Sequence, residues 1–149
     1  MMALAFEINP AIQASQLLAI AQEAYQQYVA AIGKAPAPMV ADYQAHITHD
    51  TIITAAKDGV IIAFAVIIEK EDGLWLETIA VADGYRGQGI GTALLGQVER
   101  YIAPKARSYQ LYTNEKMTRN KGWYLSLGFV LTDVKTQEGY RRIFFKKEL

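Results

Sequence analysis

The segment Tyr85–Thr92 carries three glycines at alternate positions, between the apolar run Leu74–Val81 and the amphipathic run Thr92–Ile102. Closely spaced glycines let a backbone approach a ligand without interference from Cβ atoms, and the unpaired N–H groups of a first helical turn point outward. Glycine within a helical turn costs roughly 1 kcal/mol relative to alanine, so Gly89 and Gly91 indicate a requirement other than helix stability. The pattern predicts a strand–turn–helix unit that binds a phosphate or pyrophosphate.

Length and composition fit one domain spanning residues 1–149, since 52% of the residues are hydrophobic. The chain has no cysteine, which excludes a disulfide framework, a thiolate metal site and a catalytic thiol. No apolar run approaches the roughly 18 residues that span a bilayer, and residues 1–6 lack the basic start of a secretory signal. We therefore expect a cytoplasmic protein without a membrane partner.

The net charge is zero, but the two halves of the chain differ strongly. Residues 1–83 hold ten acidic and three basic residues, a net charge of −7, whereas residues 84–149 hold five acidic and twelve basic residues, a net charge of +7. Six of these basic residues lie close together in the sequence between residues 100 and 121, and this basic cluster suits a polyphosphate ligand beside the glycine turn. No aromatic stacking platform is interleaved with the basic residues, which argues against nucleic-acid binding. Six basic residues form the cluster: Arg100, Lys105, Arg107, Lys116, Arg119 and Lys121.

Residue spacing predicts helices and strands in mixed order. A helix is expected from an Asn9 cap, with Pro10 at its first position, to Gly33. An extended linker and a shorter helix over residues 39–47 follow. The pattern as a whole indicates a mixed α/β sheet with helices on both faces. The other expected elements are strands 51–56, 60–68, 74–81 and 108–113, helices 92–102 and 118–127, and a final hairpin of strands 129–136 and 140–146.

Two familiar phosphate-binding motifs do not fit. The glycines at 87, 89 and 91 lack the Gly-x-Gly-x-x-Gly spacing of a Rossmann domain, and no acid follows about 20 residues later to hold a ribose. A Walker A loop is excluded as well, because no Gly-Lys-Ser/Thr sequence follows.

Residues 81–91 instead resemble the acyl-CoA-binding motif of the GNAT superfamily of N-acyltransferases, Gln/Arg-x-x-Gly-x-Gly/Ala, with Arg86, Gly89 and Gly91 in its fixed positions. Residues 123–129 resemble a second family segment, Tyr-x-x-x-Gly-Phe. The resemblance covers most of the chain from about residue 51 to residue 146. It implies one GNAT-like domain with a central, mostly antiparallel, twisted sheet and helices on both faces.

The resemblance also implies acetyl-CoA as acyl donor, without a metal. The pyrophosphate would lie on the glycine turn, and the pantetheine arm would lie along the backbone of the fourth strand. The family's Asn-x-x-Ala positions are occupied here by Met117 and Asn120, and Asn120 lies one helical turn before Tyr124 on the same face. The expected cofactor-binding residues are Ile79, Val81, Arg86, Gly87, Gln88, Gly89, Ile90, Gly91, Thr92 and Asn120.

The implied chemistry is direct attack of a neutral amine on the thioester, through a tetrahedral intermediate. Tyr124 would be the general acid that protonates the leaving thiolate, although a core aromatic is the alternative interpretation. Glu77 is the best candidate base, because strand alternation places it on the face of Ile79 and Val81. A water path in place of Glu77, with the carboxylate merely at an edge beside solvent or a lysine, stays open.

Two function classes follow: an N-acetyltransferase acting on a small-molecule or peptide amine, and a non-catalytic acyl-CoA-binding module. Because the acidic half would supply much of the acceptor cleft, including Glu69 and Glu77, we expect a cationic acceptor. His46 and His49 lack a third ligand for zinc and are interpreted as surface residues at a helix end. A homodimer is compatible with the sequence. Candidates for an apolar wall of the acceptor cleft are Tyr25, Tyr28, Met39 and Tyr43.

Overall fold

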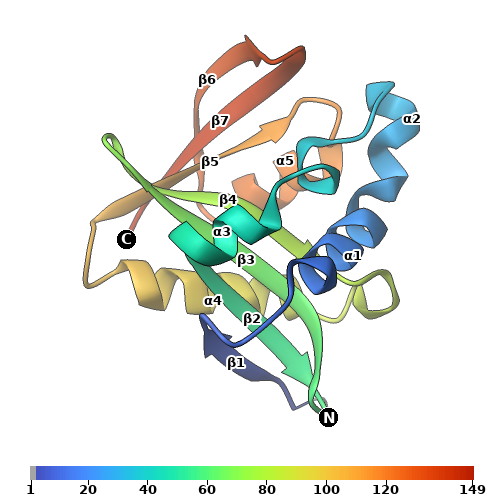
Figure 1. The fold of residues 1–149 in the computed structure, drawn as a ribbon. Helices are drawn as coiled ribbons and strands as arrows, with labels where there is room; N and C mark the ends of the chain where they lie inside the picture. The colour runs from blue at the N-terminus through green and yellow to red at the C-terminus, as the bar shows by residue number, and fades with distance from the viewer. Residues whose placement is uncertain (1–2) are drawn as a thin grey trace.

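The computed structural model of the chain describes residues 3–149, and within them seven strands form one sheet in the order β1-β2-β3-β4-β5-β7-β6 (Figure 1). All neighbouring strands of these residues run antiparallel except β4 and β5, which are parallel. The predicted mostly antiparallel sheet is therefore confirmed. The strands are β1 (Ala5–Ile8), β2 (Thr51–Lys57), β3 (Val60–Lys70), β4 (Gly73–Val81), β5 (Ser108–Asn114), β6 (Val130–Gln137) and β7 (Tyr140–Glu148).

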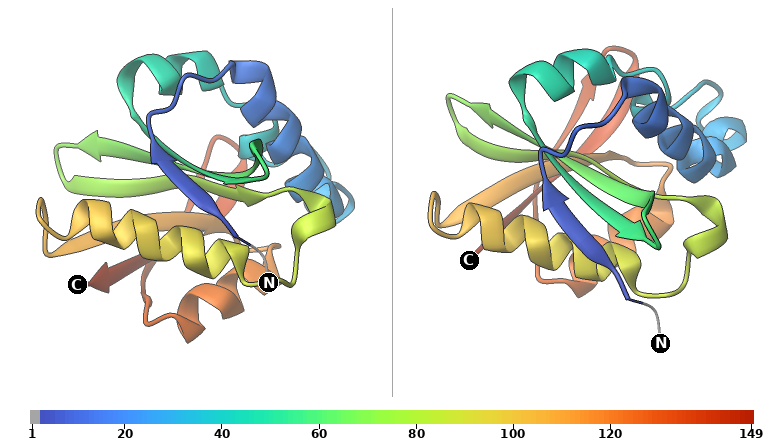
Figure 2. Two further views of the ribbon diagram at one scale, coloured as in Figure 1. Left: turned by 90° about the horizontal axis from the view of Figure 1, so that it is seen from below. Right: turned by 60° about the horizontal axis from the view of Figure 1, so that its bottom comes forward.

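Helices cover both faces of the sheet, as predicted (Figure 2). On one face, α1 and α3 pack through Leu17 and Tyr43 against Phe64 of β3. On the other face, α4 and α5 pack through Leu94 and Tyr124 into a second apolar cluster. No helix among residues 3–149 is long and apolar enough to cross a membrane. The helices are α1 (Ala14–Tyr25), α2 (Val29–Ile32), α3 (Tyr43–His49), α4 (Ile90–Ile102) and α5 (Thr118–Ser126), with short 3-10 turns at Gln26–Tyr28, Ala37–Met39 and Asp83–Tyr85.

The start of the first helix differs from the prediction. Asn9 does not cap a helix; it closes the short strand β1 onto β2, where its N–H donates to Ile52 O at 2.7 Å and its Oδ1 accepts from Ile52 N at 2.8 Å. Its backbone has φ 51°, a left-handed conformation that asparagine tolerates better than most residues. α1 begins five residues later, at Ala14. The sequence Asn-Pro thus ends a strand that the pattern analysis did not anticipate.

The strand β4 contains an irregularity that shapes the centre of the molecule. Val66 of β3 lies opposite Thr78, but the next residue, Ile67, lies opposite Leu76, so Glu77 is an extra residue on β4. β4 pairs with β5 only at Trp75 and Leu76 in the described chain. Beyond this point the two strands diverge (Figure 1). The divergence leaves the last part of β4 without backbone partners on β5 and opens the sheet.

Candidate active site

The glycine turn leads from β4 into α4 as the sequence predicts. Gly89 is the N-cap of α4, and both Gly87 and Gly89 adopt left-handed backbone conformations, with φ 74° and 77°. A Cβ added at either glycine would meet no atom within 4 Å, so internal packing does not require a glycine there. The left-handed backbone conformation does favour glycine.

The helix α4 begins at Ile90, two residues before the predicted start. Its first internal hydrogen bond runs from Ala93 N to Gly89 O at 3.0 Å. The N–H groups of Ile90, Gly91 and Thr92 therefore belong to the unpaired first turn of a 13-residue helix. This end of the helix carries partial positive charge and suits an anion.

A cleft of about 420 Å³ lies in front of this turn, between β4, α5 and the C-terminal end of α1. Gln88 is the exception among the predicted cofactor-binding residues, since its side chain is exposed and lies outside the cleft lining. Arg119, which the sequence analysis named as a member of the basic cluster but not among the cofactor-binding residues, also lines the cleft. The predicted residues that line it are Ile79, Val81, Arg86, Gly87, Gly89, Ile90, Gly91, Thr92 and Asn120.

Arg86 brings positive charge to the cleft. Its guanidinium forms an ion pair with Asp83, and its Nε is buried without a hydrogen-bond partner. A buried N–H donor without an acceptor is costly, by about 1–3 kcal/mol. Together with Arg119 on α5, Arg86 gives the cleft two guanidinium groups beside the start of α4. The two guanidinium groups and the free N–H groups at the start of α4 all favour an anionic ligand.

A second, smaller cavity of about 80 Å³ adjoins the cleft at the opening in the sheet. It is lined by residues 36–38 and 41, His46 of α3, residues 76–79 of β4 and side chains of β5, α5 and β7. The cleft and this acceptor cavity, as we call it below, share four lining residues: Tyr25, Ile79, Asn120 and Tyr124. Two molecules bound in the two spaces would meet at the diverging part of β4.

Tyr124 lies at this junction. Only 5% of the residue is exposed, and its ring packs against Phe129 and Phe145 at centroid distances of 5.4 and 5.9 Å. Burial raises the pKa of the Tyr124 phenol well above its usual value of about 10, so the hydroxyl keeps its proton at neutral pH. The ring is thus a core aromatic, while the residue also lines both the cleft and the acceptor cavity.

Tyr25 of α1 has a polar role that the sequence analysis did not foresee. Its hydroxyl donates to Ile79 O at 2.8 Å, in a buried hydrogen bond between elements 54 residues apart. Burial raises the pKa of Tyr25 well above its usual range. The bond ties α1 to β4 at the point where β4 has left β5, and so holds the shared wall of the two spaces in place. Of the other predicted wall residues, Tyr28, Met39 and Tyr43 are absent from the described lining of the acceptor cavity.

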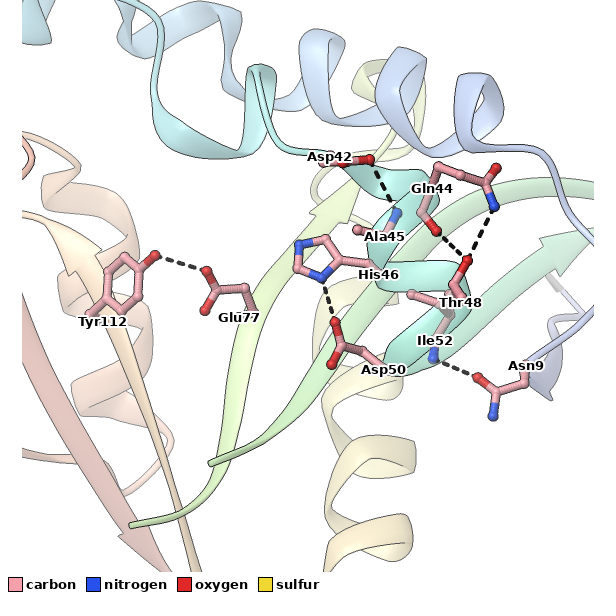
Figure 3. A network of polar contacts seen from close by, with 10 residues as sticks. All are labelled: Asn9, Asp42, Gln44, Ala45, His46, Thr48, Asp50, Ile52, Glu77 and Tyr112. Carbon is pink, nitrogen blue, oxygen red and sulfur yellow. Dashed lines mark hydrogen bonds and ion pairs between the residues drawn. The ribbon is translucent and has the colours of Figure 1, made fainter. Parts of the chain in front are cut away.

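Glu77 lines the acceptor cavity, but not for the reason given by strand alternation. The extra residue in β4 interrupts the alternation, because Leu76 and Ile79 pack into the same core cluster. Glu77 Oε1 accepts a hydrogen bond from Tyr112 Oη at 3.0 Å, and Oε2 is buried without a partner (Figure 3). The interpretation of Glu77 as an edge carboxylate beside solvent or a lysine is therefore wrong.

His46 and His49 lie in different environments. His49 is exposed, as expected, but His46 also lines the acceptor cavity, so its interpretation as a surface residue is wrong. Its Nδ1 lies 2.7 Å from Asp50 Oδ2, which fixes the ring (Figure 3). The spacing of Asp50 four residues after His46 was the available signal. Clusters of three or more His, Cys, Asp or Glu side chains suited to a metal ion are absent among residues 3–149.

Comparison with known proteins identifies the class to which this fold and site belong. The model of the acetyltransferase (GNAT) domain family matches residues 48–131, which is more than half of the chain. The chain belongs to this family, and the resemblance noted in the sequence is confirmed. Comparison with curated protein sequences gave no significant match.

Solved structures share the fold over nearly the whole chain. A GNAT family acetyltransferase from Elizabethkingia anophelis with acetyl-CoA bound has a TM-score of 0.74 at 19% identity, covering 98% of each chain. The ribosomal-protein-S18-alanine N-acetyltransferase from Escherichia coli has a TM-score of 0.77 at 18% identity, covering 98% of this chain and 94% of its own. The PaiA N-acetyltransferase from Thermoplasma acidophilum in complex with coenzyme A has a TM-score of 0.72 at 16% identity, covering 97% of this chain and 99% of its own.

Proposed function

We propose that the protein is an acetyl-CoA-dependent N-acetyltransferase that acetylates the primary amine of a small molecule or peptide. The observation that carries the proposal is the meeting of an anion-binding cleft and a separate, partly polar cavity at one point of β4. Structures of the same fold with acetyl-CoA or coenzyme A bound support the choice of donor.

The residues of the cleft fit a CoA ester. The free N–H groups between Gly87 and Thr92, with Arg86 and Arg119, would bind the pyrophosphate. Arg86 Nε, buried without an acceptor, would gain one if a phosphate oxygen lay beside it. At Ile79 and Val81, β4 has no backbone partner on β5; Ile79 O accepts from Tyr25, and the N–H groups would hold the pantetheine arm and polarise the acyl carbonyl. Asn120 and Tyr124 would close the cleft where the acyl group lies.

The reaction we propose is direct attack. The lone pair of the amine nitrogen forms a bond to the thioester carbon, and the carbon–sulfur bond of the resulting tetrahedral intermediate breaks. Tyr124 gives its proton to the departing sulfur, since the phenol is protonated at neutral pH and lies at the junction of the two spaces. An amine with a pKa near 10 is almost wholly protonated at pH 7, so a base must first remove a proton. Glu77, with Oε2 unpaired at the cavity wall, would take it.

Few of the acidic residues of the first 83 positions can contact an acceptor in this cavity. Glu77 is the one carboxylate of the first 83 residues that lines the described acceptor cavity, whereas Glu69 lines a separate surface pocket. The wall also carries Arg142 from the basic half of the chain. We retain a positively charged amine as the reacting group of the acceptor, with Glu77 as its counter-charge.

The test is release of free thiol from acetyl-CoA in the presence of a panel of primary amines: diamines, amino acids, amino acid amides and short peptides. We expect thiol release that depends on an added amine and yields the N-acetylated product. Binding of acetyl-CoA without amine-dependent thiol release for any member of the panel would instead favour a non-catalytic acyl-CoA-binding module.

A further inference from the structure

Arg142 of β7 is a buried charge in the wall of the acceptor cavity. Only 7% of the residue is exposed. Its guanidinium lies over the ring of Tyr112 at 4.4 Å from the centroid and over the ring of Tyr140 at 5.4 Å. All three side chains line the cavity. The aromatic rings hold the guanidinium in one place, as a binding group requires.

The hydrogen-bond partners of Arg142 leave much of its donor capacity unused. Nη1 donates to Gln137 Oε1 at 3.2 Å, and Nη2 lies 3.5 Å from Glu138 Oε2. The side chain of Glu138 is 79% exposed, so the ion pair is solvent-screened and weak. A guanidinium has five N–H donors, and a buried charge is costly unless it is paired and fully hydrogen-bonded. A carboxylate within the acceptor cavity would complete the site.

Arg142 and Glu77 form a matched pair of opposite charges across one side chain. Tyr112 donates its hydroxyl to Glu77 at 3.0 Å, while Arg142 lies over the face of the same ring. Tyr112 therefore contacts both charged groups, Glu77 through its hydroxyl and Arg142 through its ring face, and both line the same small cavity. A ligand that carries an ammonium and a carboxylate on one carbon would present a group to each of these charges, at hydrogen-bond distances of about 3 Å.

We propose that the acceptor is an α-amino acid with a compact, uncharged side chain, whose carboxylate binds Arg142 and whose ammonium group lies at Glu77. The inference rests on the proposed use of this cavity as the acceptor site. Arginine and carboxylate form paired, charge-assisted hydrogen bonds that orient the ligand as well as hold it. The remaining wall combines apolar residues with the neutral polar residues Thr78, Thr113, Asn114 and Asn120 and with His46. The described lining contains no further carboxylate or guanidinium, which fits an uncharged side chain. The apolar residues include Pro36, Ala37, Pro38, Ala41, Leu76 and Met117.

Calorimetry on the protein saturated with CoA, which cannot transfer an acyl group, tests this proposal. L-alanine and L-methionine are titrated alongside alaninamide and methioninamide, which keep the amine and lack the carboxylate. We expect each amino acid to bind at least tenfold more tightly than its amide, as for loss of a charge-assisted hydrogen bond. Arg142→Gln should abolish the difference. Arg141→Gln is the matched control, because Arg141 is exposed and pairs with Glu115.

Equal affinities for amino acid and amide in the unaltered protein would overturn the proposal, and this comparison does not depend on the folding of a variant. A preference for the amino acid that survives Arg142→Gln would overturn the assignment of the carboxylate to Arg142. Thiol release with the amides and with diamines reports separately on the proposed function. Amine-dependent release without a preference for amino acids would keep the acetyltransferase and remove the carboxylate site.

Discussion

At the scale of single residues, Tyr124 combines structural and chemical requirements. The same burial that makes its ring a core aromatic raises the pKa of its hydroxyl and keeps that hydroxyl protonated. A general acid for a thiolate leaving group must hold its proton until the sulfur departs. A place in the core and the proposed role as proton donor are nevertheless compatible, because Tyr124 also lines both the cleft and the acceptor cavity.

Replacing Tyr124 with phenylalanine keeps the packed ring and removes the proton donor. We expect kcat to fall by about 10²-fold or more, with little change in the affinity for acetyl-CoA. Tyr101→Phe is the matched control, because Tyr101 bonds Thr51 at 3.1 Å and lies outside both the cleft and the acceptor cavity. An unchanged turnover of the Tyr124 variant, measured by thiol release, would leave Tyr124 with a packing role alone.

Glu77→Gln retains an oxygen that accepts from Tyr112 and removes the base. The rate should fall at neutral pH and recover as the pH rises toward the pKa of the amine, so that the pH profile moves to higher pH. Glu69→Gln is the control, since Glu69 lies outside the acceptor cavity. Identical pH profiles of kcat/KM for the unaltered protein and the Glu77 variant would point to a water path.

At the scale of elements, the sequence predicted the strand–turn–helix unit because its signals are local. An apolar strand, alternate glycines and an amphipathic helix each produce a pattern in adjacent residues. The extra residue of β4 produces no such pattern, because it depends on the partner strand, and strict alternation therefore misplaced Glu77. The four-residue strand β1 was too short to show a period, and Asn9-Pro10 resembles a helix start as closely as a strand end.

The turn before α4 provides a prediction about the cofactor. Gly89→Val places a branched side chain at φ 77° and directs it into open space in front of the turn. We expect the affinity for acetyl-CoA to fall at least tenfold, because that space would hold the pyrophosphate. Calorimetry measures the affinity, and urea unfolding shows whether the variant remains folded.

Gly96→Ala on the same helix is the matched control. A Cβ at Gly96 also meets no atom within 4 Å, but Gly96 lies within the body of α4 and outside the cleft lining. This variant should bind acetyl-CoA normally and be more stable by up to about 1 kcal/mol. Unchanged affinity of a folded Gly89→Val variant would contradict the placement of the pyrophosphate.

At the scale of the whole molecule, the acidic and basic halves of the chain correspond only in part to the acceptor cavity and the cofactor cleft. The basic half supplies Arg86 and Arg119 to the cleft, as expected. The acceptor cavity draws on both halves, because the fold places Arg142 of β7 on the same cavity wall as Glu77 of β4. Which residues converge across a sheet depends on strand order, and local sequence patterns do not contain that order. The cytoplasmic location stays a prediction.

The buried tyrosines make stability depend on alkaline pH. Burial raises their pKa above the value of about 10 that they have in the unfolded chain, so the folded state holds protons that the unfolded state has lost. The free energy of unfolding should thus be insensitive to these groups below pH 10 and fall as the pH rises beyond it. Urea unfolding across this range checks the trend, and titration of these six tyrosines near pH 10 in the folded protein would contradict it. The groups are Tyr25, Tyr28, Tyr43, Tyr109, Tyr112 and Tyr124.

The central claim is that a donor and an acceptor meet where β4 leaves β5. A crystal structure of the complex with acetyl-CoA tests it most directly. We expect the pyrophosphate on the N–H groups between Gly87 and Thr92, and the acyl group between Ile79 and Tyr124, open toward Glu77. A complex in which the pyrophosphate binds away from this turn, or the acyl group lies outside the junction of the cleft and the acceptor cavity, would contradict the claim.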